Sequence, residues 1–260
     1  MNVIKTDLGK HIDEVNVYPI ADVHIGSSHS EMKKFKAYIK EIEEDDKGVV
    51  FLNGDLINNA IRISVSDIYE ERFMPEQAID IVVNMLTPIK DKIVSIVSGN
   101  HEDRTYKQTG LSPTKNIAHR LGCIDKHHEV GNLVFITFGT ARNRDDYRNT
   151  FSIYATHGSG GGAKVGSKAN QVQQLSQVVI ADVYIHSHTH TPLTFKEDFY
   201  LATHNTKGVQ KRTSLFVNTN AFEGYGGYSQ SKKMRPSTIE PVRVRLTVDS
   251  RGNKMPKAEL

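Results

Sequence analysis

The chain of 260 residues has one cysteine, Cys123, and no tryptophan. An internal disulfide is therefore excluded, and any metal site would have to use imidazole, carboxylate or amide ligands instead of a set of thiolates. The sequence also lacks a run of about 18 apolar residues, the length that a membrane-spanning helix needs. Residues 1–10 have no apolar core of the kind found in secretory signals, so we expect a cytoplasmic protein that does not associate with a membrane.

The composition is that of an ordinary folded protein, with 38% hydrophobic and 24% charged residues. A chain of this length can form one α/β domain, and we expect residues 1–260 to do so. The charge is uneven, because residues 207–260 contain 11 Lys or Arg and only 4 Asp or Glu. Such a basic portion is typical of proteins with an anionic partner such as nucleic acid, but a solvated basic surface has the same composition.

Short apolar segments alternate with helical patterns in the first hundred residues. We expect strands at 15–21, 48–52 and 93–97, one helix that begins after Ser30 as its N-cap, and a second helix from Pro75. This β-α-β-α-β order predicts a largely parallel sheet, in which ligands bind outside the carboxyl ends of the strands.

The second half of the chain is richer in strands. Apolar or alternating patterns predict strands at 133–138, 151–156, 183–185, 215–217 and 242–248, and a helix at 170–178. We therefore expect a second set of strands that packs with the first.

Polar groups that suit metals follow several of the expected strands. They form five blocks: Asp22-Val23-His24, Gly54-Asp55, Gly99-Asn100-His101-Glu102, Thr156-His157-Gly158 and His188-Thr189-His190. Each block alone is weak evidence, since a histidine near a strand end is usually a structural residue. Five blocks in order would converge on one edge of a parallel sheet, and together they predict a shared metal site.

The five blocks, which span residues 22–190, resemble the signature blocks of the calcineurin-like metallophosphoesterase superfamily. The resemblance implies an α/β fold, specifically a four-layer α/β/β/α sandwich with two mixed sheets and a dinuclear metal site at the strand ends. In such a fold we expect residues 207–260 to complete the second sheet.

The resemblance also implies a ligand set. One metal would be held by Asp22, His24, Asp55 and His190, and the other by Asp55, Asn100, His157 and His188. Asp55 would bridge two divalent ions about 3.5–4 Å apart. A shell of imidazole, carboxylate and amide groups favours Mn²⁺, with Fe, Zn²⁺, Co²⁺ or Ni²⁺ as alternatives, over Mg²⁺ or Ca²⁺.

The implied reaction is hydrolysis of a phosphoester bond by a two-metal mechanism, with Asp55, Asn100 and His101 as the catalytic residues. His101 would lie beside the metals without binding them and would protonate the leaving group or stabilise the phosphate. Asn58 is expected to support a ligand from outside the metal shell.

Two departures from the family pattern are visible. Ser187 occupies the place where the last block usually has glycine, and the second block continues as residues 56–60 without the Asp-Arg-Gly of the protein Ser/Thr phosphatases. The second departure counts against a phosphoprotein phosphatase. His186, an additional imidazole, is expected on the opposite face of its strand from Ser187.

Several basic residues are candidates for contact with substrate. Arg104 in the third block is a phosphate contact or a surface ion pair; Lys164 and Lys168, in and after a glycine-rich segment at 158–166, are phosphate contacts on a flap or residues of an ordinary loop. Downstream, Tyr225 and Tyr228 are interleaved with Lys232, Lys233 and Arg235. That pattern suits single-stranded nucleic acid, although a polar loop joining two late strands is the ordinary explanation.

The preferred hypothesis is a phosphodiesterase that acts on nucleic acid, DNA or RNA, or on nucleotides. The alternatives are a phosphomonoesterase with a small substrate, and a binding subunit that keeps the fold without the chemistry. A structural zinc protein is disfavoured, because closed zinc sites are usually rich in thiolates. The sequence gives no indication of the oligomeric state.

Overall fold

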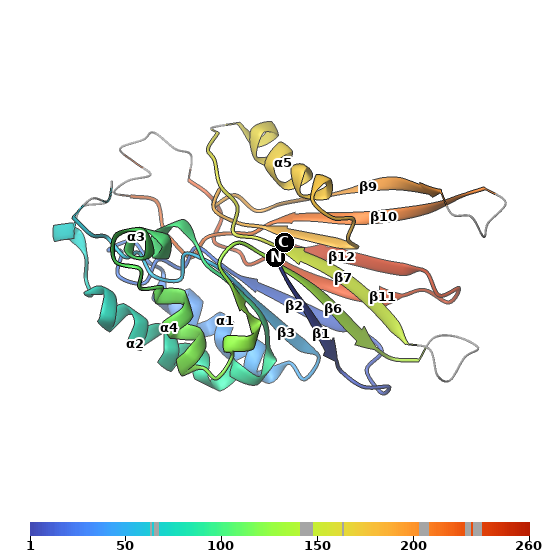
Figure 1. The fold of residues 1–260 in the computed structure, drawn as a ribbon, viewed down its shortest axis with the longest axis horizontal. Coiled ribbons are helices and arrows are strands. Elements are labelled where there is room, and N and C mark those ends of the chain that lie inside the picture. The colour runs from blue at the N-terminus through green and yellow to red at the C-terminus, as the bar shows by residue number, and fades with distance from the viewer. Residues whose placement is uncertain are drawn as a thin grey trace.

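The computed structural model describes residues 1–62, 64, 68–140, 148–162, 164–202, 208–226, 230 and 236–260. Two six-stranded mixed sheets pack face to face, with helices on both outer faces (Figure 1). One sheet has the strand order β12-β11-β2-β3-β4-β5, and the other has the order β1-β6-β7-β8-β10-β9.

The strands are β1 (Asn2–Asp7), β2 (Val15–Ile20), β3 (Gly48–Asn53), β4 (Ile93–Val97), β5 (His127–His128), β6 (Asn132–Phe138), β7 (Asn149–Ala155), β8 (Val183–His186), β9 (Leu193–Ala202), β10 (Val209–Asn218), β11 (Arg243–Val248) and β12 (Lys254–Glu259). The α-helices are α1 (Met32–Glu44), α2 (Pro75–Leu86), α3 (Asn100–Thr109), α4 (Pro113–Arg120) and α5 (Val165–Gln173). Short 3₁₀ helices cover Ile68–Glu70, Thr87–Lys92, Ile124–Lys126 and Gln174–Gln177.

The sheet that contains β2, β3 and β4 is parallel at its centre and is covered by α1, α2 and α4. The helices contribute apolar residues at helical spacing, such as Phe35, Ile39 and Ile42 of α1, and all three are buried. These strands read as nearly continuous apolar runs because both faces of the sheet are covered. The expected strands at 15–21, 48–52 and 93–97 are confirmed to within one residue at each end.

Three apolar cores lie between successive layers. The first joins the helices α1, α2 and α4 to their sheet, the second fills the space between the two sheets, and the third lies between the other sheet and α5. In the third core, the ring of Phe216 stacks on Tyr184 on one neighbouring strand and on Phe195 on the other. The four-layer α/β/β/α arrangement predicted from the sequence is therefore confirmed.

The basic C-terminal portion contributes to both sheets, which corrects the expectation that it completes one of them. β10 lies between β8 and β9, whereas β11 joins the other sheet by pairing antiparallel with β2. The chain crosses between sheets because β10 and β11 bury alternate apolar residues toward the same central core.

Two local predictions are wrong. The N-cap of α1 is Glu31, and the hydroxyl of Ser30 instead donates to the carbonyl of Val23 at 2.8 Å. The helix expected at 170–178 begins earlier, at Val165, within the end of the glycine-rich segment. The tertiary contact of Ser30 explains the first difference, and the second concerns a glycine-rich turn next to the helix start. Local helix propensity includes neither influence.

Among the residues that the structure describes, no helix has both the length and the apolar character that crossing a membrane requires.

Candidate metal centre

The five blocks meet at one edge of the two sheets because of strand direction. β2, β3 and β4 run parallel in one sheet, and β7 and β8 run parallel in the other. The residues that follow their carboxyl ends are therefore brought together, as the topology of α/β sheets predicts. Asn100 enters from the first turn of α3, directly after β4.

The backbone of the site is unusual. The residues Asp22, His24, Asp55, His188 and His190 all have positive φ, between 51° and 66°. Residues other than glycine rarely adopt this left-handed conformation, and such residues cluster at functional sites, where the surrounding structure holds them in place. Ser187 is not among them, so its position does not require the conformational freedom of the glycine usually found there.

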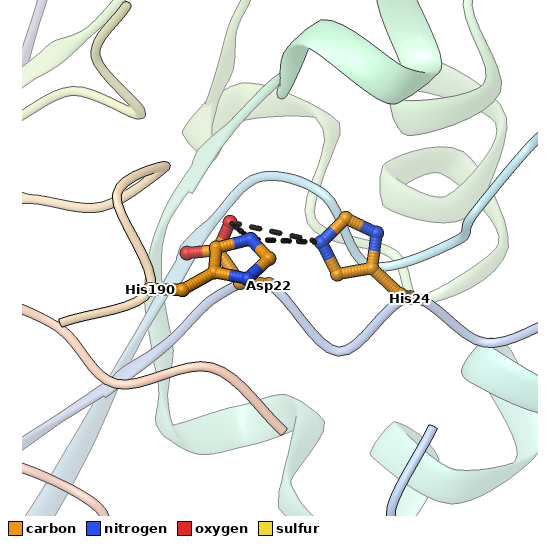
Figure 2. Close-up of side chains that lie close together, drawn as sticks. All are labelled: Asp22, His24 and His190. Atoms are coloured by element: carbon orange, nitrogen blue, oxygen red, sulfur yellow. Dashed lines mark hydrogen bonds and ion pairs between the residues drawn. The ribbon is translucent and has the colours of Figure 1, made fainter. Parts of the chain in front are cut away.

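The Asp22 group consists of Asp22, His24 and His190, whose ligand atoms converge (Figure 2). The Nε2 atoms of the two imidazoles face each other at 3.2 Å, and Asp22 Oδ1 lies 3.2 Å from His190 Nε2. Asp22 Oδ2 accepts a hydrogen bond from the backbone N–H of His188 at 3.0 Å. The backbone hydrogen bond to Oδ2 therefore fixes the carboxylate of Asp22, and Oδ1 points toward the two imidazoles.

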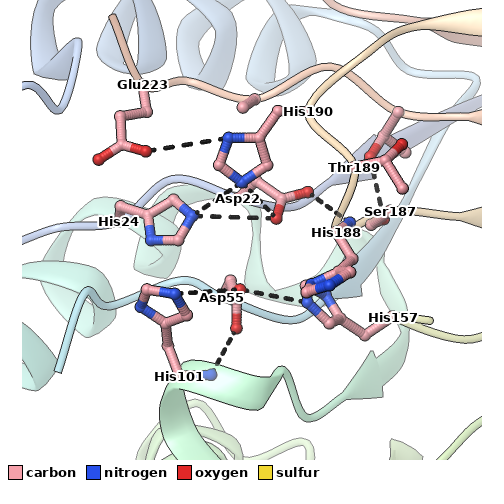
Figure 3. A network of polar contacts seen from close by, with 12 residues as sticks. Asp22, His24, Asp55, His101, His157, Ser187, His188, Thr189, His190 and Glu223 are labelled. Carbon is pink, nitrogen blue, oxygen red and sulfur yellow. Dashed lines mark hydrogen bonds and ion pairs between the residues drawn. The ribbon is translucent and has the colours of Figure 1, made fainter. Parts of the chain in front are cut away.

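The Asp55 group consists of Asp55, His157 and His188 (Figure 3). Asp55 Oδ2 lies 3.2 Å from His157 Nε2, and Asp55 Oδ1 accepts the backbone N–H of His101 at 2.8 Å. His157 donates from Nδ1 to the carbonyl of Asn53 at 2.8 Å, which turns its Nε2 toward the centre. Fixing one imidazole nitrogen in this way is how proteins orient a metal-binding histidine.

The amide of Asn100 also points into this part of the site. Its Oδ1 lies 3.1 Å from His157 Nε2. Asn100, His157, His188 and Asp55, the set expected for one metal, are thus in mutual contact or share a cluster.

His101 lies between the two groups and beside Arg104. His101 Nδ1 contacts the carbonyl of Asn58 at 2.7 Å, and the guanidinium of Arg104 is 3.0 Å from His101 Nε2. That nitrogen is also 3.8 Å from Asp55 Oδ2. With His24 and Asp55, His101 forms a further cluster that has the geometry to hold a metal ion, so its expected place outside the metal shell stays a prediction.

The protonation of the site reflects its two carboxylate–imidazole pairs. Burial opposes the charge of Asp55, but the adjacent imidazole of His157 holds its pKa well below the usual range. Burial likewise opposes the charge of His157, yet Asp55 raises the pKa of His157 to about 10. The pair of Asp22 with His190 has the same form, with the pKa of Asp22 lowered and that of His190 raised.

His101 differs from these two imidazoles. Burial, the largest influence, lowers the pKa of His101 to about 3, despite the opposing effect of Asp55. His101 is therefore neutral at pH 7 in the protein without substrate.

The donor set fits divalent metal ions. Asp22 Oδ1, which faces the Nε2 atoms of His24 and His190, is a buried atom for which the described residues provide no hydrogen-bond partner of good geometry. Two imidazole Nε2 atoms that face each other at 3.2 Å can share at most one proton, whereas a cation can bind both. Imidazole and carboxylate ligands together suit Mn²⁺, Fe, Co²⁺, Ni²⁺ or Zn²⁺.

The other predicted residues have varied places. Lys168 does not point at the centre, because its ammonium donates to the carbonyl of Thr189 at 3.1 Å and to the hydroxyl of Thr191. It thus fixes the loop that carries His190. Lys164 is exposed at the start of α5.

The side chain of Asn58 donates to Glu71 and does not contact a predicted ligand. Its main-chain carbonyl contacts Nδ1 of His101, which is not one of the predicted ligands. His186 lies outside the metal clusters of the described residues and contacts the Asn218 side chain at 2.7 Å.

The basic C-terminal portion is largely paired where it is described. Arg243 and Arg245 contact Glu259, and Arg212 and Lys254 contact the buried Asp182. Tyr225 is exposed, whereas Tyr228, Lys232, Lys233 and Arg235 lie outside the described residues.

Three residues that support the centre received no role in the sequence analysis: Glu102, Asn53 and Glu223. Glu102 accepts hydrogen bonds from the backbone N–H groups of Asp55, Ile57 and Gly99 at 3.0–3.1 Å, and so ties the second block to the third. Its place three residues after Gly99, at the start of α3, lets it accept the N–H of the N-cap residue, which is the half of a capping box that does not need an N-cap side chain. Asn53 and Glu223 gave no such signal, since their contacts join residues that are far apart in the chain.

Fold and site together define a class of protein: a two-sheet α/β sandwich with a carboxylate–imidazole metal centre at the strand ends. The sequence model of the family described as calcineurin-like phosphoesterase matches residues 16–192. The chain belongs to this family, whose members bind divalent metals. Membership supports the assignment of the protein as a hydrolase.

No curated protein shows significant sequence similarity to the chain. Among solved structures, a metallophosphoesterase from Sphaerobacter thermophilus is similar with 11% identity and a TM-score of 0.41, covering 93% of this chain and 87% of that one. A predicted phosphoesterase from Streptococcus pneumoniae has 12% identity and a TM-score of 0.37, covering 95% and 99%. Vps29 from Chaetomium thermophilum has 12% identity and a TM-score of 0.41, covering 94% of each chain.

Proposed function

We propose that the protein is a cytoplasmic, metal-dependent phosphodiesterase that acts on nucleic acid or nucleotides. The observation that carries this proposal is the position of Asp55, which belongs to one ligand cluster with His24 and to another with His157. A carboxylate in that position can serve two cations at once, and two adjacent cations are the usual means of cleaving a phosphoester in line.

The proposed ligands fall into two sets, one for each ion. The Asp22 group, with Asp55, would hold one ion, and Asn100, His157 and His188, again with Asp55, would hold the other. When bound, such ions supply an activated water and neutralise charge on the phosphoryl oxygens, and Mn²⁺ is our preferred ion. The protein contributes the buried carboxylates and the oriented imidazoles that would hold the ions.

Arg104 and His101 are proposed to act on the substrate. The guanidinium that contacts His101 Nε2 is a planar donor suited to a phosphoryl oxygen. Since His101 is neutral at pH 7 without substrate, we propose that the negative charge of a bound phosphate favours its protonation. His101 would then donate a proton to the leaving oxygen or stabilise the phosphate.

Nucleic acid as substrate rests on the charge of residues 207–260. Lys211, Arg212, Arg243, Arg245 and Lys254 are engaged in ion pairs, and the proposal falls on Lys232, Lys233 and Arg235 because they follow the aromatic residues Tyr225 and Tyr228. Residues that bind phosphates release counterions, so binding through them weakens as salt rises.

The test compares an oligonucleotide with a small chromogenic phosphodiester and the matching monoester, each with Mn²⁺ and the alternative metals. Hydrolysis of the oligonucleotide should fall steeply with salt, and hydrolysis of the small diester should barely change. Replacing Lys232, Lys233 and Arg235 by Ala should flatten the salt dependence. A matched triple variant, Lys5→Ala with Lys36→Ala and Lys115→Ala, removes equal charge from exposed positions outside residues 207–260 and should not.

Equal salt responses for both substrates, or no oligonucleotide cleavage in any metal, would reject nucleic acid and favour a small diester. Faster turnover of the monoester would favour the phosphomonoesterase alternative. Metal binding without turnover of any substrate would identify a binding subunit.

A further inference from the structure

The segment that contains Glu223 is anchored directly beside Asp22. The backbone N–H of Phe222 donates to the carbonyl of Asp22 at 2.9 Å, and the N–H of Gly224 donates to the carbonyl of His29 at 2.8 Å. An antiparallel bridge pairs Ser30 with Glu223. Main-chain contacts on both sides of Glu223 therefore fix where its side chain begins.

The carboxylate of Glu223 joins two parts of the site. Ser27 donates from its hydroxyl to Glu223 Oε1 at 2.8 Å, and Glu223 Oε2 lies 3.8 Å from His190 Nδ1, within ion-pair distance. Figure 3 shows this carboxylate on the far side of the His190 ring from Asp22. His190 thus has Asp22 at one nitrogen and Glu223 at the other.

The other oriented imidazoles have different partners. His157 Nδ1 contacts the carbonyl of Asn53, and His101 Nδ1 contacts the carbonyl of Asn58. A carbonyl fixes the ring, but a carboxylate also makes the opposite nitrogen more basic and a better metal ligand. The two halves of the centre are therefore chemically unequal.

We propose that Glu223 is a positioning residue that strengthens cation binding at the Asp22 group and has no such effect at the Asp55 group. The proposal rests on the metal centre of the proposed function, not on its substrate. Glu223 lies beyond residues 16–192, so a part of the chain outside the family match completes one half of the site.

The experiment titrates the full, metal-free chain with Mn²⁺ by isothermal titration calorimetry. In Glu223→Gln, which keeps the shape but removes the charge, one of the two binding steps should weaken by about 10–100-fold, and the other should not change. Ser27→Ala should weaken the same step by less. Glu240→Gln, at an exposed glutamate of the same C-terminal portion, is the matched control and should leave both steps unchanged.

A second measurement separates metal binding from folding. Glu223→Asp keeps the charge on a shorter side chain and should recover part of the lost affinity, and the metal-free variants should melt at the temperature of the unaltered chain. In the unaltered chain, ¹⁵N chemical shifts of the ring should place the His190 proton on Nδ1 when Mn²⁺ is replaced by diamagnetic Zn²⁺.

Unchanged binding in Glu223→Gln, or equal weakening of both steps, would overturn the proposal. So would a fall in melting temperature of Glu223→Gln that accounts for the loss of affinity. If Glu223→Gln weakens one binding step but the unaltered chain hydrolyses no phosphoester, the role of Glu223 stands and the proposed function is rejected. If Glu223→Gln leaves both binding steps and turnover unchanged, the proposed function stands and the role of Glu223 is rejected.

Discussion

The Asp22 group and the Asp55 group are held by different parts of the chain. In the Asp55 group, the carboxylate of Glu102 binds the backbone N–H of Asp55, and the carbonyl of Asn53 orients His157. The side chains of Asp55 and His157 are only 1% and 4% exposed. These contacts to Asp55 and His157 lie close to the strand ends, within the family match.

The Asp22 group depends on distant residues. His190 has a side chain that is 28% exposed, sits in a loop fixed by Lys168, and faces Glu223. Asp22 accepts a backbone hydrogen bond from Phe222. Local strand geometry therefore places Asp55 and His157, whereas the Asp22 group also needs the late segment at residues 222–223 to fold against it.

The largest effect is expected from a change of Asp55, the residue proposed to bind metal in both groups. Asp55→Asn should lower turnover of a small phosphodiester by several orders of magnitude and weaken metal binding in both groups, because the amide cannot neutralise two cations. Asp22→Asn is the matched variant and should cost one metal per chain. Turnover and metal content of purified protein, by inductively coupled plasma mass spectrometry, provide the measurement. An Asp55→Asn protein with two metals and a near-normal rate would refute the bridging position.

The second change tests the residue that lies between the halves. His101→Asn should keep both metals and lose about 10²–10⁴-fold in rate, with the greatest loss for substrates whose leaving groups are poor, since a good leaving group needs little protonation. Rates for a series of aryl phosphodiesters, with metal content measured in parallel, test this. His119→Asn, at an exposed position in α4, is the control. Loss of a metal would place His101 in the metal shell instead, and an equal rate loss for all leaving groups would contradict acid catalysis.

The smallest expected effect is the pH dependence of metal affinity, which reports how many protons the histidines of the two groups must release. The carboxylates of Asp55 and Asp22 raise the pKa values of His157 and His190, that of His157 to about 10, so at pH 7 a cation must displace a proton from His157. Metal affinity should therefore increase as pH rises, by up to about tenfold per pH unit for each proton displaced. Calorimetric titration with Mn²⁺ at pH 6 and pH 8, in buffers of different ionisation enthalpy, counts the protons released. Affinity that is constant or falls with rising pH would contradict this assignment.

The sequence predicted the strands that carry the ligands well, because they are buried on both faces and are therefore continuously apolar. It did not predict β1, β9 or β12, whose residues alternate between partly buried and exposed positions or include charged side chains. These are outer strands, and their pairing depends on a neighbouring strand more than on their own composition. Lys168 illustrates the same limit in the site. Its charge suggested contact with a substrate phosphate, but in the folded protein its ammonium binds Thr189 and Thr191 and supports their loop.

The sequence by itself determined which side chains come together at the candidate metal centre, because each of them follows an apolar strand and parallel strands end at a common edge. Its left-handed backbone, the ion pairs that raise the pKa values of His157 and His190, and the carboxylate of Glu223 were decided only by the tertiary structure. The physical reason is separation along the chain: Glu223 contacts Ser27 across 196 residues and Asn53 contacts Ser187 across 134. Contacts of that range leave no periodic or local trace in a sequence, and they exist only once both sheets have packed.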